Sequence, residues 1–107
     1  MLNSKQKINI FKTASLCRNF EQETFKYAKE KKIKIPIYLS AGQEYISSTI
    51  SNLTRELKIN PLIFPQHRCH SIYLSFGGDI SKLINELFGS SLGWTYGMGG
   101  SASIHST

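Results

Sequence analysis

The apolar residues between about Lys5 and Lys32 recur with the period of an α-helix, and this pattern constrains the fold more than any other feature. Steps of four, three, three, four and three residues bring them onto one helix face. They are Ile10, Ala14, Cys17, Phe20, Thr24 and Tyr27. Proline cannot continue a helix, so Pro36 ends the pattern. We expect a long helical arm over about 5–32, followed by an extended connection.

A second helix is predicted to begin the core segment, which covers about residues 40–89. Ser40 and Gln43 have the spacing of a capping box, in which each side chain bonds to the other residue's amide. Apolar residues follow at steps of four, three and four, and we expect them to face inward. They are Ile46, Ile50, Leu53 and Leu57. The small hydroxyl residues 47–49 would let another element approach this helix closely.

The apolar run 62–64 lies between two prolines and predicts a short buried strand. A lone strand leaves its backbone groups unpaired, so its partner is expected elsewhere. Further helices are expected through 72–76 and from a cap at Asp79 to a stop near Gly89. Residues 90–107 are rich in glycine and serine and predict a flexible loop. These elements resemble the front of a larger domain.

A net charge of +6 and a pI near 9.5 leave nucleic acid, an anionic membrane or an acidic ligand open as partners. We interpret the lysines at the end of the first helix as solvent-exposed side chains whose positive charge complements the helix dipole. They are Lys26, Lys29, Lys31, Lys32 and Lys34. A small basic nucleic-acid-binding domain is an alternative, but these lysines lack interleaved aromatic residues for base stacking. We therefore expect no nucleic-acid partner.

Two cysteines do not make a disulfide scaffold, and we expect Cys17 and Cys69 to be free thiols. We see no secretory leader, and no apolar run approaches the ~18 residues of a membrane-spanning helix. The sequence therefore predicts a cytoplasmic setting with no membrane partner.

The stretch from Phe64 to His70 carries two imidazoles, a guanidinium, an amide and a thiol. Arg68 follows the predicted strand and could bind a phosphate or carboxylate through two parallel hydrogen bonds. A surface arginine or a structural ion pair is the plainer alternative. We interpret the stretch as an anion-binding turn.

A metal site at this stretch is not expected, although His67 and His70 lie three residues apart. Zinc needs three or four protein ligands, Cys69 points away from both imidazoles in a helix, and His105 lies in the predicted flexible tail. The same divergence argues against a nucleophilic Cys69–His70 pair.

Residues 97–102 formally match a dinucleotide fingerprint, Gly-x-Gly-x-x-Ala. That motif requires a preceding apolar strand and a following helix, and the sequence indicates neither. We interpret the match as coincidental.

Six short motifs occur in the order and spacing of one known family. They are Arg18-x-Phe20-Glu21, Tyr38-Leu39-x-x-Gly42-Gln43-Glu44, His67-Arg68-x-His70, Gly77-Gly78-Asp79, Glu86-Leu87-Phe88-Gly89 and Gly97-x-Gly99-Gly100-Ser101. The chain resembles the N-terminal part of the alpha subunit of thiamin-diphosphate-dependent 2-oxo acid dehydrogenases, of the pyruvate and acetoin dehydrogenase type. The resemblance implies the α/β thiamin-diphosphate-binding fold, here its mostly helical N-terminal part over 1–107.

The resemblance also implies roles for individual residues. His67 and Arg68 match the pair that contacts the cofactor diphosphate, and we include Gln66 in this cofactor-binding set. His70 matches a histidine near the active-site entrance and is the candidate catalytic residue. The family often has histidine where this chain has Tyr38, and methionine-histidine where it has Ala102 and Ser103.

The implied activity is oxidative decarboxylation of a 2-oxo acid, with acyl transfer to a lipoyl carrier. The implied partners are a beta subunit, a lipoyl-bearing acyltransferase and the 2-oxo acid. In the family, Gly-Asp-Gly and an asparagine pair hold magnesium, and we expect residues absent from this chain to do so. The chain alone is therefore expected to be inactive, as a fragment, a split subunit or a non-catalytic remnant.

Overall fold

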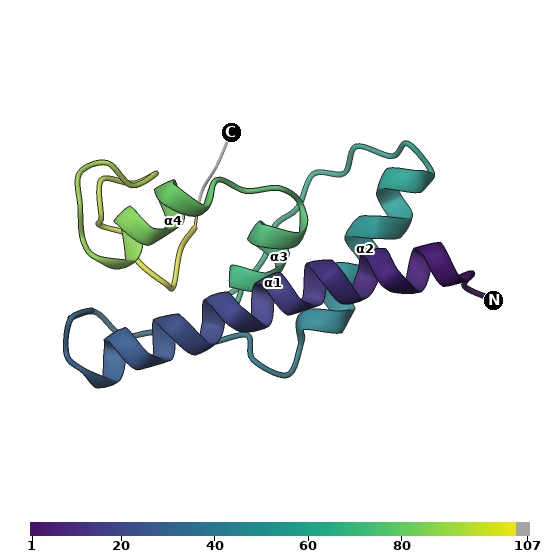
Figure 1. The fold of residues 1–107 in the computed structure, drawn as a ribbon. Coiled ribbons are helices and arrows are strands. Elements are labelled where there is room, and N and C mark those ends of the chain that lie inside the picture. Colours follow the sequence, from purple (N-terminus) through teal and green to yellow (C-terminus); the bar gives the residue numbers. More distant parts are fainter. Residues whose placement is uncertain (105–107) are drawn as a thin grey trace.

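The computed structural model describes residues 1–104 and contains four helices within them (Figure 1). They are α1 (Ser4–Lys29), α2 (Glu44–Glu56), α3 (His70–Ser75) and α4 (Ile80–Leu87). Helix α1 runs along the molecule, and α2 and α3 pack against it and against each other. The mostly helical character predicted from the sequence is confirmed.

Helix α1 begins at a complete capping box, which was not predicted from the sequence. The Asn3 side chain accepts the amide of Gln6 at 2.8 Å, and the Gln6 side chain accepts the amide of Asn3 at 2.8 Å. The predicted apolar face is confirmed, because Ile10, Ala14, Cys17 and Thr24 are buried. The helix ends three residues earlier than predicted, and Lys31 turns the chain with a left-handed φ of 59°.

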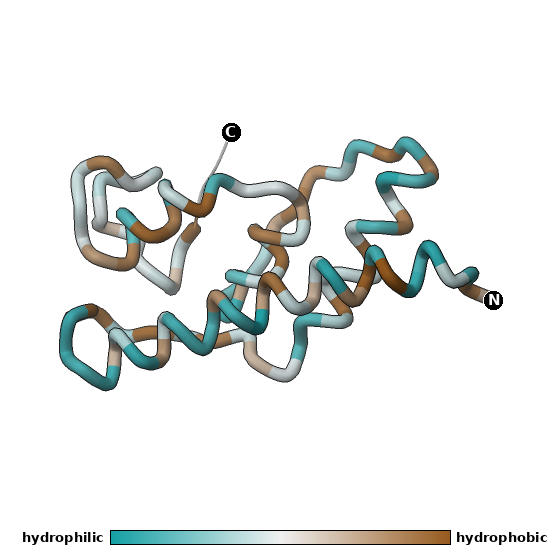
Figure 2. The backbone as a smooth tube through the Cα atoms, in the orientation of Figure 1, coloured by the Kyte–Doolittle hydropathy of each residue, from teal (hydrophilic) through white to brown (hydrophobic). Residues whose placement is uncertain are grey.

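The lysines at this end of α1 all lie in solvent, as predicted. Figure 2 shows the end of α1 and the turn after it as a hydrophilic stretch. One of these lysines pairs with a neighbour, Lys32 with Glu30 at 2.9 Å. None of the helices within residues 1–104 combines the length and apolarity that crossing a bilayer requires.

The hydrophobic core joins the C-terminal half of α1 to α3 and α4. Its buried members come from three helices and from the connection after α1. They are Cys17, Ile33, Tyr73, Leu74, Leu83 and Leu87. Both cysteines are buried free thiols, as predicted, and burial raises the pKa of each. A buried thiol with a raised pKa, such as Cys69, is a weak nucleophile.

The predicted capping box at Ser40 is wrong. Helix α2 begins at Glu44 behind Gln43, which makes no capping hydrogen bond with its side chain. Ser40 is buried, and its hydroxyl donates instead to Glu21 on α1 at 2.8 Å. The Ser40 hydroxyl therefore bonds to Glu21, a residue distant in sequence, instead of capping the helix that follows it.

The predicted inner face of α2 is also wrong. Ile46, Ile50 and Leu57 are 63%, 47% and 70% exposed. The opposite, small polar face is the buried one, and it contains Ser47, Ser48, Ser51 and Asn52. The hydroxyl of Ser48 donates to the Ile10 carbonyl of α1 at 2.5 Å, so the close approach predicted from the hydroxyl residues is confirmed.

The predicted strand at 62–64 is not present among residues 1–104, which contain no strand at all. A strand needs a neighbouring strand for its backbone groups, and none lies beside this segment. Leu62 and Phe64 are 88% and 89% exposed and line the rim of a surface groove of about 810 Å³. The later helices are confirmed as α3 and α4, and Asp79 caps α4 by accepting the amide of Lys82 at 3.0 Å.

Candidate functional site

The predicted cofactor-binding residues Gln66, His67 and Arg68 form an exposed turn between Pro65 and α3. The His67 ring packs edge-on against the ring of Tyr38, with 5.6 Å between their centroids. Tyr38 lies on the connection after α1, so this contact joins that connection to the turn that carries the predicted cofactor-binding residues.

Arg68 has no carboxylate partner among residues 1–104. The ion pairs in that range join Arg18 to Glu44, Lys32 to Glu30, and His70 to Glu21. Arg68 also has a left-handed φ of 63°. Lys31 and Lys58 share this conformation directly after α1 and α2, where it commonly ends helices. Arg68 precedes a helix instead, so helix termination does not explain its backbone conformation.

His70, the candidate catalytic residue, is fully buried. Its Nδ1 lies 2.9 Å from Oε1 of Glu21, and its Nε2 lies 2.9 Å from Oγ of Ser101. The ring also packs edge-on against Phe20, at 5.9 Å between centroids. Both ring nitrogens are therefore engaged inside the protein, and His70 can reach a ligand only through one of these partners.

A small polar interior surrounds this histidine, and sequence reasoning missed it. Glu21 is 1% exposed and lies on the buried face of α1. Ser40 donates to it, lies 2.6 Å from the Ser71 hydroxyl, and accepts the Ser71 amide at 3.1 Å. The available signal was the position of Glu21, four residues after Cys17 and three before Thr24 on the apolar stripe.

The glycine-rich loop is built around Glu86, another buried carboxylate that was not singled out. Five donors of the loop form hydrogen bonds to the two carboxylate oxygens of Glu86. They are the amide and the hydroxyl of Thr95 and the amides of Gly97, Gly99 and Gly100. Burial opposes ionisation, but the Thr95 hydroxyl and the loop amides outweigh it and lower the pKa of Glu86 from 4.5 to about 2.

This arrangement explains the glycines at 97–100. Gly97 has a left-handed φ of 77°, and a side chain there would run into the backbone of Gly89. The loop amides that a dinucleotide fingerprint would offer to phosphate are taken by Glu86 instead. Residues 90–104 form a series of turns, and hydrogen bonds to Glu86 hold these turns against α4. We had expected a flexible loop here.

The exposed turn carries hydrogen-bond donors of the kind that bind anions. Gln66, His67 and Arg68 supply amide, imidazole and guanidinium groups, and no acidic side chain neutralises the arginine within the described part of the chain. His67 and His70 are not brought together, and His105 lies outside the described residues. No group of three or more metal-ligating side chains occurs in residues 1–104.

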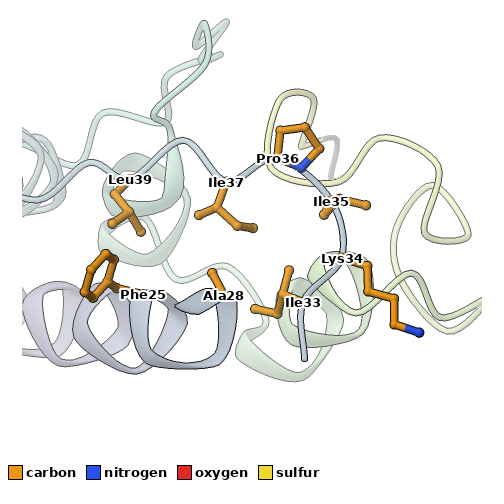
Figure 3. Close-up of a pocket in the computed structure, with 8 residues that line it drawn as sticks. All are labelled: Phe25, Ala28, Ile33, Lys34, Ile35, Pro36, Ile37 and Leu39. Atoms are coloured by element: carbon orange, nitrogen blue, oxygen red, sulfur yellow. The ribbon is translucent and has the colours of Figure 1, made fainter. Parts of the chain in front are cut away.

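An apolar pocket of about 500 Å³ lies elsewhere and involves none of the predicted site residues. Figure 3 shows Phe25 and Ala28 of α1 facing Ile37 and Leu39 of the connection. Lys34 extends away from these apolar side chains (Figure 3). The residues that line this pocket place no polar group toward its interior, so we assign the pocket no role.

Comparison with curated proteins supports the interpretation from the motifs. The alpha subunit of the mitochondrial pyruvate dehydrogenase E1 component from Saccharomyces cerevisiae is 31% identical over 98 residues, which are 92% of this chain and 23% of that protein. The Chaetomium thermophilum subunit is 29% identical over 94% of this chain and 24% of its own length. The Schizosaccharomyces pombe subunit is 34% identical over 71% and 18%. No family model and no solved structure matches.

The chain is thus related to the alpha subunits of thiamin-diphosphate-dependent 2-oxo acid dehydrogenases, and the predicted resemblance is confirmed. Within that class, its relatives are alpha subunits of pyruvate dehydrogenase, which are oxidoreductases. The chain spans about a quarter of the length of these relatives.

Proposed function

We propose that this chain is the helical N-terminal part of an α/β thiamin-diphosphate-binding domain in a 2-oxo acid dehydrogenase. The enzyme would decarboxylate a 2-oxo acid and pass the acyl group to a lipoyl carrier, with the lipoyl disulfide as acceptor. The similarity to pyruvate dehydrogenase alpha subunits over nearly the whole chain supports this proposal.

The observation that carries the proposal is the state of Arg68. Its guanidinium has no carboxylate partner in residues 1–104, and its backbone holds a left-handed conformation without a helix-ending role. Strained backbone of this kind concentrates at ligand-binding sites. An unneutralised guanidinium beside an exposed imidazole and amide suits an anionic ligand.

In the proposed site, Arg68 would hold the diphosphate electrostatically, and His67 and Gln66 would donate hydrogen bonds to it. The bound cofactor supplies the carbanion chemistry that decarboxylation needs, and the protein positions it. Tyr38 would support His67 through the contact between their rings. His70 would act on substrate or lipoyl indirectly, because both of its nitrogens are engaged inside the chain.

The remaining parts of the site are proposed to come from other residues. Magnesium would be held by residues absent from this chain, and a beta subunit and a lipoyl-bearing acyltransferase would be the protein partners. The exposed apolar face of α2 supports the proposal that the chain packs against further protein. The cytoplasmic setting stays a prediction, and the named relatives are mitochondrial proteins.

The proposal is tested by titrating thiamin diphosphate, with magnesium, into the assembled enzyme by calorimetry. Losing one hydrogen bond between Arg68 and a charged group, as Arg68→Ala does at the least, costs about 1.5–3 kcal/mol. We therefore expect cofactor affinity to fall by about ten- to a hundredfold. Lys58→Ala is the matched control, because Lys58 is another exposed cation with a left-handed φ.

The outcome for the two variants decides the assignment. Weakened binding in Arg68→Ala with unchanged binding in Lys58→Ala supports the diphosphate contact. Unchanged cofactor affinity in Arg68→Ala removes this residue from the site.

A further inference from the structure

We propose that Glu21, His70 and Ser101 form a directional hydrogen-bond relay in which the Ser101 hydroxyl donates to His70 and His70 donates to Glu21. Glu21 and Ser101 would then be positioning residues for the proposed cofactor site. The assignment of donors rests on the contacts in this chain alone, and the positioning role rests on the proposed function.

The direction of the relay follows from the partners of the Ser101 hydroxyl. A serine hydroxyl has one proton to donate and can accept two hydrogen bonds. Its oxygen accepts the amide of Tyr38 at 2.8 Å, and its other contact is Nε2 of His70 at 2.9 Å. Ser101 is 1% exposed, so its proton needs an acceptor inside the protein. Among residues 1–104, His70 Nε2 is the acceptor that the contacts provide.

The tautomer of His70 is fixed as a consequence. If Nε2 accepts the Ser101 proton, the ring proton of the neutral imidazole lies on Nδ1. Nδ1 is 2.9 Å from Oε1 of Glu21, an oxygen that also accepts the Ser40 hydroxyl at 2.8 Å. The same oxygen therefore receives both donors, while Oε2 of Glu21 is buried with no partner in the described range.

The relay also reaches the exposed turn that carries the predicted cofactor contacts. Ser101 holds the backbone of Tyr38, and the ring of Tyr38 packs against the ring of His67. The chain of contacts thus runs from α1 through α3 and the glycine-rich loop to the connection before α2. A substitution at Ser101 should therefore change the surroundings of the His67 ring, although no direct contact between these two residues is observed within residues 1–104.

The first test reads the His70 tautomer directly, by long-range proton–nitrogen NMR on the nitrogen-labelled chain at pH 8. The three histidines are assigned with the variants His67→Gln and His105→Gln. We expect His70 to carry its proton on Nδ1 and to show Nε2 as an unprotonated nitrogen. A proton on Nε2, whether in the other neutral tautomer or in an imidazolium, overturns the proposal.

The second test removes the hydroxyl with Ser101→Ala and uses the exposed loop serine variant Ser91→Ala as the control. Loss of the donor should shift the His70 nitrogen signals toward a tautomer mixture and move the His67 ring signals, whereas Ser91→Ala should move neither. Unchanged His70 signals in folded Ser101→Ala contradict the relay. Unchanged His67 signals contradict its extension to the cofactor turn.

Both measurements use the chain without cofactor. A failure of thiamin diphosphate to bind the assembled enzyme would sink the proposed function and leave the tautomer result intact. If Ser101→Ala does not fold, the wild-type tautomer still decides the relay.

Discussion

Neutralising Glu86 should loosen the whole glycine-rich loop, because one carboxylate holds five of its donors. In Glu86→Gln one acceptor oxygen becomes a donor and faces the amides and hydroxyl that it formerly bound. Each pKa unit corresponds to about 1.4 kcal/mol, so a fall from 4.5 to about 2 is worth about 3 kcal/mol before solvent screening. We expect a loss of about 2–3 kcal/mol in the free energy of unfolding.

The stability that Glu86 contributes should depend on pH in a defined direction. The pKa of Glu86 is lower in the folded chain, so its contribution is fully present above about pH 4.5 and is lost as pH falls toward about 2. The difference in stability between wild type and Glu86→Gln should therefore shrink over that window. Above it, the difference should be constant.

Urea unfolding followed by the fluorescence of Trp94 measures the effect where it occurs. Trp94 is the one tryptophan, lies in the loop, and donates to the Tyr73 hydroxyl at 2.7 Å. Glu23→Gln is the control, since Glu23 is exposed on α1 and makes no hydrogen bond with its side chain among those found in residues 1–104. A loss below about 0.5 kcal/mol would contradict this role of Glu86, as would a stability difference that does not change with pH below 4.5.

Three further substitutions test the packing of α1 and α2. Ser48→Val should cost about 1–3 kcal/mol in chemical unfolding, because Ser48 is fully buried against α1 and its hydroxyl donates to a carbonyl there. Ile50→Asn should change stability by less than about 0.5 kcal/mol and weaken association with the proposed protein partner in sedimentation experiments, because this side chain is 47% exposed. Arg18→Gln should lower the midpoint of the same unfolding assay, because it leaves the Glu44 carboxylate, which is 3% exposed, without its cation; an unchanged midpoint would contradict this.

Local patterns predicted the helices well. The period of α1, the Asp79 cap and the stop near Gly89 depend on neighbours within a few residues, and the structure contains each of them. The inner face of α2 depends on which neighbour it meets. Apolar spacing identified the stripe at Ile46 and Ile50, but α1 approaches the opposite, serine-rich face because small side chains allow closer packing.

The hydrogen-bond donors of the two buried carboxylates could not be predicted from sequence patterns, for a different reason. Glu21 and Glu86 each depend on donors distant in sequence, namely His70, Ser40 and the loop amides. A carboxylate in a helix usually lies in solvent, and the sequence alone does not show which donors will surround it. The exposed turn at Gln66 to Arg68 was interpreted as an anion site from its residue types, and this stays a prediction.

In the proposed function, this chain supplies only part of a diphosphate site, centred on Arg68. The most direct measurement is a calorimetric titration of thiamin diphosphate with magnesium into the isolated chain, and into the chain assembled with its proposed beta subunit. We expect no micromolar binding by the isolated chain, and saturable binding by the assembly that Arg68→Ala weakens. Binding by the isolated chain with a Kd near 1 μM, about −8 kcal/mol, would contradict it.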